Sequence, residues 1–184
     1  MLTKPYVYLI LLCFFSACQS KNSTIVESKT DTLKVGFSKF AGSQLYGNES
    51  LTFIKTISED TITFTYFDSL LSKKSRTYSL LKTTKGSYEL LNNSYLGYVN
   101  KFIALDSILL LKYEFLDPPM DGDGAVILNP ELGEIANYSY TWGNSFLISK
   151  FNGYAIPKQL TEILLSDSMR SPHYYYLKDY GNKE

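Results

Sequence analysis

The feature that most constrains the fold is a period-two alternation of apolar and polar residues, repeated in short runs along most of the chain. The clearest run is 61–67, in which Ile62, Phe64 and Tyr66 alternate with three threonines. Successive side chains of a β-strand point to opposite faces, so one face of this run is expected to be buried and the other polar. The run 51–57 is similar, and Ser58-Glu59-Asp60 between the two is short enough for a hairpin.

Turn-forming residues separate the other apolar runs. Asn92-Asn93-Ser94, Asn129-Pro130 and Asn152-Gly153 are examples, and such residues favour the backbone angles that tight turns require. Further strands are predicted at 76–83, 87–91, 98–105, 108–116, 124–129, 134–142 and 145–151. The spacing of Leu160, Ile163 and Leu164 after Pro157 instead predicts one short helix near 157–166.

The N-terminus has the layout of a secretory signal peptide. Lys4 precedes an apolar stretch over 6–15, and the small residues Ser16 and Ala17 precede Cys18. The apolar stretch is shorter than the roughly 20 residues that a membrane-spanning helix needs. We therefore expect residues 1–17 to be a cleaved signal, 18–32 a polar tether, and 33–184 a single domain.

The sequence Phe15-Ser16-Ala17-Cys18 resembles a bacterial lipobox, with phenylalanine at a position that usually holds leucine. The resemblance implies that Cys18 is lipidated, for example with palmitate, and that it anchors the chain to a membrane. Two or more acyl chains hold a protein stably, whereas one holds it only weakly. Gln19 stands where many lipoproteins of Gram-negative bacteria carry an inner-membrane retention aspartate, and no acidic cluster follows it. We therefore expect attachment to the outer membrane, on its periplasmic side.

Cysteine content and charge exclude several functions. Cys13 would leave with the signal and Cys18 would carry lipid, so neither a thiol nucleophile nor a cysteine-bound zinc is expected in the mature domain. The chain has 18 basic and 18 acidic residues, and loss of Lys4 leaves 17 against 18, a net charge of −1. A nearly neutral chain has no general attraction for nucleic acid.

The segment 125–135 (AVILNPELGEI) resembles a hairpin found in β-rich periplasmic lipoproteins, which include lipocalin-like barrels and the half-barrels of lipoprotein carriers. The tyrosine- and lysine-rich, alanine-poor composition is similar to that of lipoproteins from Bacteroidetes. We therefore predict a mainly β fold, an antiparallel barrel or half-barrel that is lipocalin-like, with one short helix near the C-terminus. A sandwich is the other arrangement that the spacing of strands and turns allows.

No catalytic or metal site is predicted. His173 is the single histidine, and the sequence lacks the G-x-S-x-G motif of serine hydrolases. The segment Asp121-Gly122-Asp123-Gly124 faintly resembles a calcium loop. Ala125 and Leu132 occupy positions where an EF-hand needs ligands, which favours an ordinary turn. No cofactor is expected.

Tyr138, Tyr140 and Trp142 form the most distinctive aromatic pattern. At a period of two they would share one face of a strand, and such a row of rings can stack on sugars or line an apolar pocket. The alternative is that the three rings are ordinary core residues, because aromatic side chains dominate protein cores.

Five of the nine aspartates are followed by Ser or Thr and then an apolar residue. This pattern resembles the O-glycosylation acceptor of secreted proteins from Bacteroidetes, and it is also what a turn leading into a strand produces. The acceptor hydroxyls would be those of Thr32, Thr61, Ser69, Ser107 and Ser168.

Two functions remain open. The first is a binding module that holds a small hydrophobic ligand, a lipid, a glycan or a peptide in the cell envelope. The second is a structural or accessory subunit of an envelope complex, with another envelope protein as its partner. An enzyme is disfavoured because the sequence shows no catalytic constellation.

Lipidation gives the first testable prediction. Expressed in a bacterium that makes lipoproteins, the wild-type chain should be heavier than its mature polypeptide and should fractionate with membranes. The Cys18→Ser chain should lose both properties, because no thiol remains to accept the lipid. Mass spectrometry and membrane fractionation measure the two effects, and equal masses with equal solubility for both chains would contradict lipidation.

Overall fold

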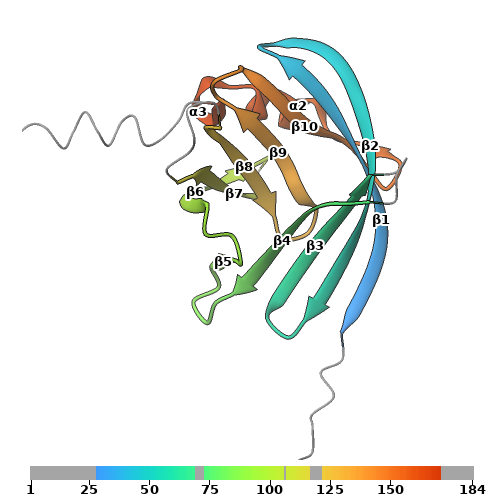
Figure 1. Ribbon diagram of the computed structural model, residues 1–184, viewed down its shortest axis with the longest axis vertical. Helices are drawn as coiled ribbons and strands as arrows, with labels where there is room; N and C mark the ends of the chain where they lie inside the picture. Colours follow the sequence, from blue (N-terminus) through green and yellow to red (C-terminus); the bar gives the residue numbers. More distant parts are fainter. Residues whose placement is uncertain (1–27, 69–72, 106, 117–121, 171–184) are drawn as a thin grey trace, which may run out of the picture.

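The computed structural model describes residues 28–68, 73–105, 107–116 and 122–170. Within them, ten strands form one antiparallel sheet that curls into a nearly closed barrel, and a two-residue eleventh strand pairs beside β10 (Figure 1). The strands are β1 (Lys29–Ala41), β2 (Gln44–Ser58), β3 (Thr61–Asp68), β4 (Lys74–Lys82), β5 (Tyr88–Leu91), β6 (Leu96–Ala104), β7 (Ile108–Phe115), β8 (Gly124–Asn129), β9 (Gly133–Ser139), β10 (Asn144–Phe151) and β11 (Tyr154–Ala155). The predicted mainly β, antiparallel barrel fold is thus confirmed.

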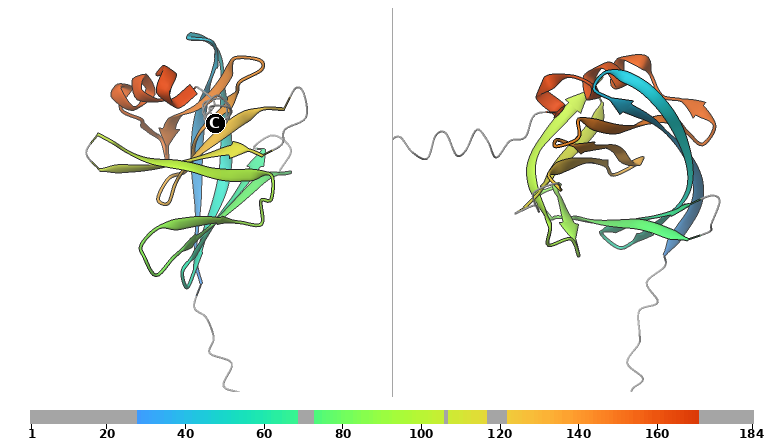
Figure 2. Two further views of the ribbon diagram at one scale, coloured as in Figure 1. Left: turned by 90° about the vertical axis from the view of Figure 1, so that its left-hand side faces the viewer. Right: turned by 45° about the horizontal axis from the view of Figure 1, so that its top comes forward.

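The strand order is an up-and-down meander with one gap. β1 pairs with β10, so the first and last long strands of the chain lie side by side. β5 and β6 follow one another in the sequence, yet they form the two edges of the sheet and do not pair. The barrel therefore consists of two five-stranded halves, β1–β5 and β6–β10, that share the β1–β10 ladder and separate at the β5–β6 seam (Figure 2).

The alternation in the sequence reproduces the two faces of the barrel wall. In β3, Phe64 and Tyr66 are fully buried inside the barrel. On its other face Thr63 and Thr65 pair their hydroxyl oxygens with those of Ser79 and Thr77 on β4, at 3.0 and 3.4 Å. Apolar rings therefore fill the interior, while short hydroxyl side chains line the exterior of the same strands.

Most predicted strands lie within two residues of their observed bounds, but the N-terminal ones differ. Residues 29–32, expected in the tether, begin β1 and pair with β2 from Lys29 opposite Ile57. β2 begins at Gln44 and not at 51, because its first half extends the ladder with β1 beyond the end of β3. This extension is largely exposed, so no alternation of apolar residues marks it in the sequence.

Helix α2 (Lys158–Leu164) confirms the predicted helix, and the four-residue α3 (Asp167–Arg170) follows it. Pro157 stands at the N-cap, and Leu160 and Leu164 are buried. The helices lie outside the barrel, at one end of it (Figure 2). The Tyr138 hydroxyl of β9 donates a hydrogen bond of 2.8 Å to the Leu164 carbonyl, which fixes the C-terminal end of α2 to the sheet. No helix within the described residues is long and apolar enough to cross a membrane.

An ion pair crosses the barrel interior. Arg76 on β4 donates through Nε to the carboxylate of Glu134 on β9, which is completely buried. The guanidinium lies over the rings of Tyr66 and Phe37, at 5.1 and 5.5 Å from their centroids. The Tyr66 hydroxyl accepts a hydrogen bond of 2.6 Å from the Glu134 backbone N–H. Burial raises the pKa of the Glu134 carboxyl, while the charge of Arg76 opposes that rise.

Replacement of Arg76 tests this interaction. Arg76→Met leaves a buried carboxylate without its cation, so the free energy of unfolding at neutral pH should fall by about 3–5 kcal/mol. The pKa of Glu134 in the folded variant should rise further above its unfolded value of about 4.3. Because the folded variant would bind a proton at Glu134 more tightly than the unfolded chain does, its stability falls as the pH rises from the unfolded pKa to the folded pKa of Glu134. The deficit relative to wild type should therefore be smaller at pH 4 than at pH 8.

Urea denaturation at the two pH values measures both effects. Lys158→Met is a matched control, since Lys158 forms an exposed i,i+4 pair with Glu162 at 3.4 Å. Its loss should cost less than about 0.5 kcal/mol. An Arg76→Met deficit that is independent of pH would contradict a role for the Glu134 charge.

Candidate functional site

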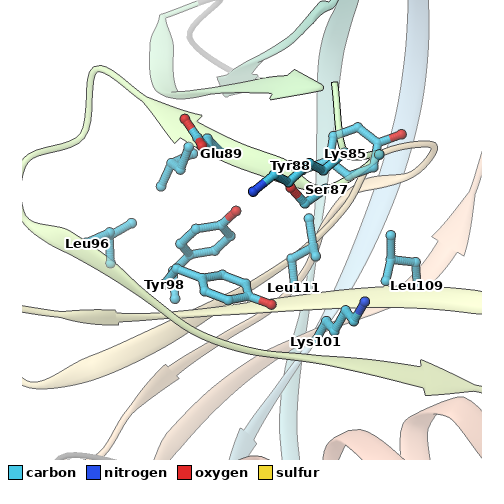
Figure 3. A pocket seen from close by; sticks show the side chains of 12 residues that line it. Lys85, Ser87, Tyr88, Glu89, Leu96, Tyr98, Lys101, Leu109 and Leu111 are labelled. Carbon is cyan, nitrogen blue, oxygen red and sulfur yellow. The ribbon is translucent and has the colours of Figure 1, made fainter. Parts of the chain in front are cut away.

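The candidate site is a cavity of about 590 Å³ at the β5–β6 seam, here called the seam cavity. Its walls come from the β4–β5 turn and β5 on one side, and from β6 and β7 on the other (Figure 3). The lining residues are Lys85, Gly86, Ser87, Tyr88, Glu89, Leu90, Leu96, Tyr98, Lys101, Leu109, Leu111 and Tyr113. The cavity lies where two edge strands that are consecutive in the chain fail to pair.

The β4–β5 turn positions the first wall. The Thr83 N–H donates to the Ser87 carbonyl at 2.8 Å, and the hydroxyl oxygens of the same two residues lie 2.6 Å apart. Gly86 within the turn has φ of +74°, a left-handed conformation that glycine adopts without strain. The following strand, β5, pairs with β4 through four residues only, so this wall is short.

The second wall is shaped by an irregularity in β6. The register between β6 and β7 shifts between Tyr98 and Asn100, which is characteristic of a β-bulge. Tyr98 pairs with Tyr113 on β7, and their rings meet edge-to-face with centroids 5.6 Å apart. Tyr98 is about half exposed, whereas Tyr113 is buried, so the aromatic pair extends from the opening of the cavity to its interior.

The Tyr113 hydroxyl is the most informative atom of the site. It is buried and has no hydrogen-bond partner among the described residues, although Tyr113 lines the cavity. A buried polar group without a partner costs about 1–3 kcal/mol, so such groups are uncommon in native proteins. Burial raises the pKa of Tyr113 to about 12, and the nearby Tyr98 and Glu89 add to the rise. The hydroxyl therefore stays protonated and is available to donate a hydrogen bond.

Three ionisable side chains, Lys85, Glu89 and Lys101, also line the cavity. Figure 3 shows Lys85 and Glu89 on one side and Lys101 across from them, beside Leu109. Within the described part of the chain neither lysine forms a salt bridge, so both ammonium groups are available at the site. Two lysines against one glutamate give the lining a formal charge of +1.

The aromatic row predicted from the sequence does not form one face. β9 ends at Ser139, so the expected strand over 134–142 is too long. Tyr138 is buried beneath α2, and the Tyr140 hydroxyl donates to Glu114 Oε1 at 2.9 Å. Trp142 lies in the β9–β10 turn with 64% of its surface exposed, outside the seam cavity.

The reason for the early end of β9 is a side-chain bond in the neighbouring loop. Asp123 Oδ1 accepts hydrogen bonds from both the backbone N–H and the hydroxyl of Thr141, and the Asp123 carbonyl accepts one from the Tyr140 N–H. These bonds hold 140–143 in a turn, which breaks the period of two. The three rings therefore point to three different environments.

The other predicted sites are scattered. Thr32 on β1 and Ser107 in the β6–β7 turn are exposed, and Thr61 is half-buried at the start of β3. Cys18, Ser69 and His173 lie outside the described residues, as does Asp121 of the glycine-rich turn. Ser168 belongs to helix α3. Glycosylation of these residues stays a prediction.

The described residues contain no group of three or more His, Cys, Asp or Glu side chains that could hold a metal ion. The seam cavity itself was not predicted from the sequence. Its residues belong to strands that were expected, but no sequence signal marks β5 and β6 as neighbours that stay unpaired.

Comparison with known proteins does not assign the chain, since no family model and no curated protein matches its sequence.

Two tyrosine-to-phenylalanine substitutions test the state of the Tyr113 hydroxyl. Tyr138→Phe removes a buried hydrogen bond to the Leu164 carbonyl, so it should lower the free energy of unfolding by about 1 kcal/mol. Tyr113→Phe removes a hydroxyl that has no protein partner among the described residues, so stability should stay within about 0.5 kcal/mol of wild type or increase. Chemical denaturation of the two variants measures the difference. Equal losses would show that the Tyr113 hydroxyl has a partner in the folded chain.

Proposed function

We propose that this chain is a lipid-anchored binding protein of the cell envelope, and that it holds a small amphipathic ligand in the seam cavity. The observation that carries the proposal is the buried hydroxyl of Tyr113, a residue that lines the cavity, which has no hydrogen-bond partner among the described residues. A ligand with a hydrogen-bond acceptor would satisfy this donor and remove its desolvation cost.

The walls favour an apolar body on the ligand. Leu90, Leu96, Leu109 and Leu111 line the cavity together with the rings of the tyrosines. A volume of about 590 Å³ lies within the range of roughly 300–1,000 Å³ that is typical of small-molecule sites. Burial of an apolar chain against these leucines would supply affinity, but the hydrophobic effect is not directional. The polar groups of the lining would set the orientation of the ligand.

The charges favour an anionic head group. Lys85 and Lys101 come from opposite walls and together outnumber the single carboxylate of Glu89. A carboxylate or phosphate held between them would gain charge-assisted hydrogen bonds. Of the classes expected from the sequence, an acidic lipid therefore fits the lining better than a neutral glycan.

The same proposal includes the location expected from the N-terminus. Lipidation of Cys18 would anchor the barrel to a membrane, and Gln19 after it favours the periplasmic side of the outer membrane. The alternative function, an accessory subunit of an envelope complex, requires no ligand in the seam cavity.

A pair of amphiphiles tests the proposal. Dodecanoate and dodecanol share one chain length and differ in head-group charge, and both are titrated below the concentrations at which they aggregate. We expect both to bind, with dodecanoate the tighter. Lys101→Gln should weaken dodecanoate about 2- to 5-fold and leave dodecanol unchanged, because a partly exposed ion pair contributes up to about 1 kcal/mol. Isothermal titration calorimetry measures each dissociation constant.

Lys158→Gln, which removes an equal charge from α2, is the control and should alter neither constant. If neither amphiphile binds, the seam cavity is not an amphiphile site and the accessory-subunit alternative is favoured. Equal affinities for the two amphiphiles would leave an apolar site and remove the role of the lysines.

A further inference from the structure

Two hairpins meet at one end of the barrel and form an exposed apolar surface, here called the hairpin tip. It consists of the β1–β2 turn with the start of β2, and of the β9–β10 turn. The Gly42 N–H donates a hydrogen bond of 3.0 Å to the Gly143 carbonyl, and Ala41 pairs with Asn144. The two turns therefore lie side by side, at the end of β1 opposite to its start at Lys29 (Figure 1).

Three large side chains are exposed on the hairpin tip. Leu45 and Tyr46 are 53% and 54% exposed, and Trp142 is 64% exposed. Single exposed apolar residues are normal on protein surfaces, but a cluster of them indicates contact with a partner or a membrane. Leu45 and Tyr46 follow directly after the β1–β2 turn and Trp142 lies in the adjacent β9–β10 turn, so the three residues form a cluster.

The hairpin tip also lacks charge. Residues 40–48 and 135–149 contain no Asp, Glu, Lys or Arg, although charged residues make up 20% of the chain. Charged residues beside the two turns are engaged: Lys39 and Glu49 pair at 3.0 Å, and Asp123 of the β7–β8 loop accepts two hydrogen bonds from Thr141. A surface that meets only water, or a charged protein partner, has no need to be free of charge over both turns.

We propose that the hairpin tip inserts into the interfacial region of a lipid bilayer. Tryptophan and tyrosine prefer that region, because their rings are apolar while their N–H and O–H groups stay in contact with water and head groups. Uncharged turns avoid the cost of moving ions out of water. The contact is independent of the seam cavity, whose lining contains none of these residues.

The length of the barrel fixes how the chain would lie. β1 has 13 residues and spans about 43 Å. The ten residues between Cys18 and Lys29 reach at most about 36 Å when fully extended. A chain held at Cys18 therefore brings the hairpin tip to the same bilayer when the barrel lies along the membrane surface, with one contact at each end.

Trp142 is the only tryptophan of the chain, so its fluorescence reports on the hairpin tip alone. The full-length protein is reconstituted into phosphatidylcholine vesicles with or without brominated phosphatidylcholine, which quenches tryptophan only at close contact. We expect a blue-shifted emission that brominated lipid quenches strongly and that aqueous acrylamide quenches weakly. The double variant Leu45→Ser, Tyr46→Ser should lose most of the quenching by brominated lipid.

Ile103→Ser is the matched control, because Ile103 is 62% exposed near the far end of β6, and it should leave the quenching unchanged. Denaturation midpoints like that of wild type establish that each variant is folded. Emission that acrylamide quenches fully and brominated lipid does not would overturn the proposal. Shielding from acrylamide without quenching by brominated lipid would also overturn it and assign the hairpin tip to a protein contact.

Discussion

A buried ion pair between Arg76 and Glu134 links the two halves of this barrel across its interior. Its two five-stranded halves share a single backbone ladder, between β1 and β10, and no ladder joins them at the β5–β6 seam. Arg76 and Glu134 connect β4 of one half to β9 of the other through the interior. Lys55 of β2 adds a second link, since its ammonium group contacts both the carboxylate and the carbonyl of Glu131 in the β8–β9 turn. Side chains thus hold together the two halves where the backbone does not.

β5 and β6 both form strands, so the seam stays open because of the features of these two edges. Short edge strands, bulges and lysines are the devices by which β-proteins keep edges from pairing. β5 has four residues, β6 carries a bulge near Tyr98, and Lys101 stands on that edge. β7, the strand next to the edge strand β6, is buried on both faces over most of its length. Its one face closes the cavity with Leu111 and Tyr113, and its other face buries Lys112 and Glu114.

The features that carry the proposals occupy separate parts of the molecule. β1 begins at Lys29, the hairpin tip lies at the other end of that strand, and the seam lies across the barrel from the β1–β10 ladder. In the proposed function, this separation leaves the side of the barrel open to a ligand while the two ends contact the membrane. It also means that substitutions at one feature leave the others unchanged, so the three can be studied independently.

The sequence alone determined the local structure, because alternation, turn residues and helical spacing are written in neighbouring residues. It predicted β3 to β8, β10, one short helix near 157–166 and the barrel class. The signal peptide and the lipidation of Cys18, which lie outside the described residues, stay predictions. The sequence placed Tyr138, Tyr140 and Trp142 on one face, and the Asp123–Thr141 bond from a different loop overruled that pattern. Tertiary structure decided the rest: which strands stay unpaired, which lysines line one cavity, and that Arg76 contacts Glu134. Each depends on residues tens of positions apart, whose proximity no local pattern records.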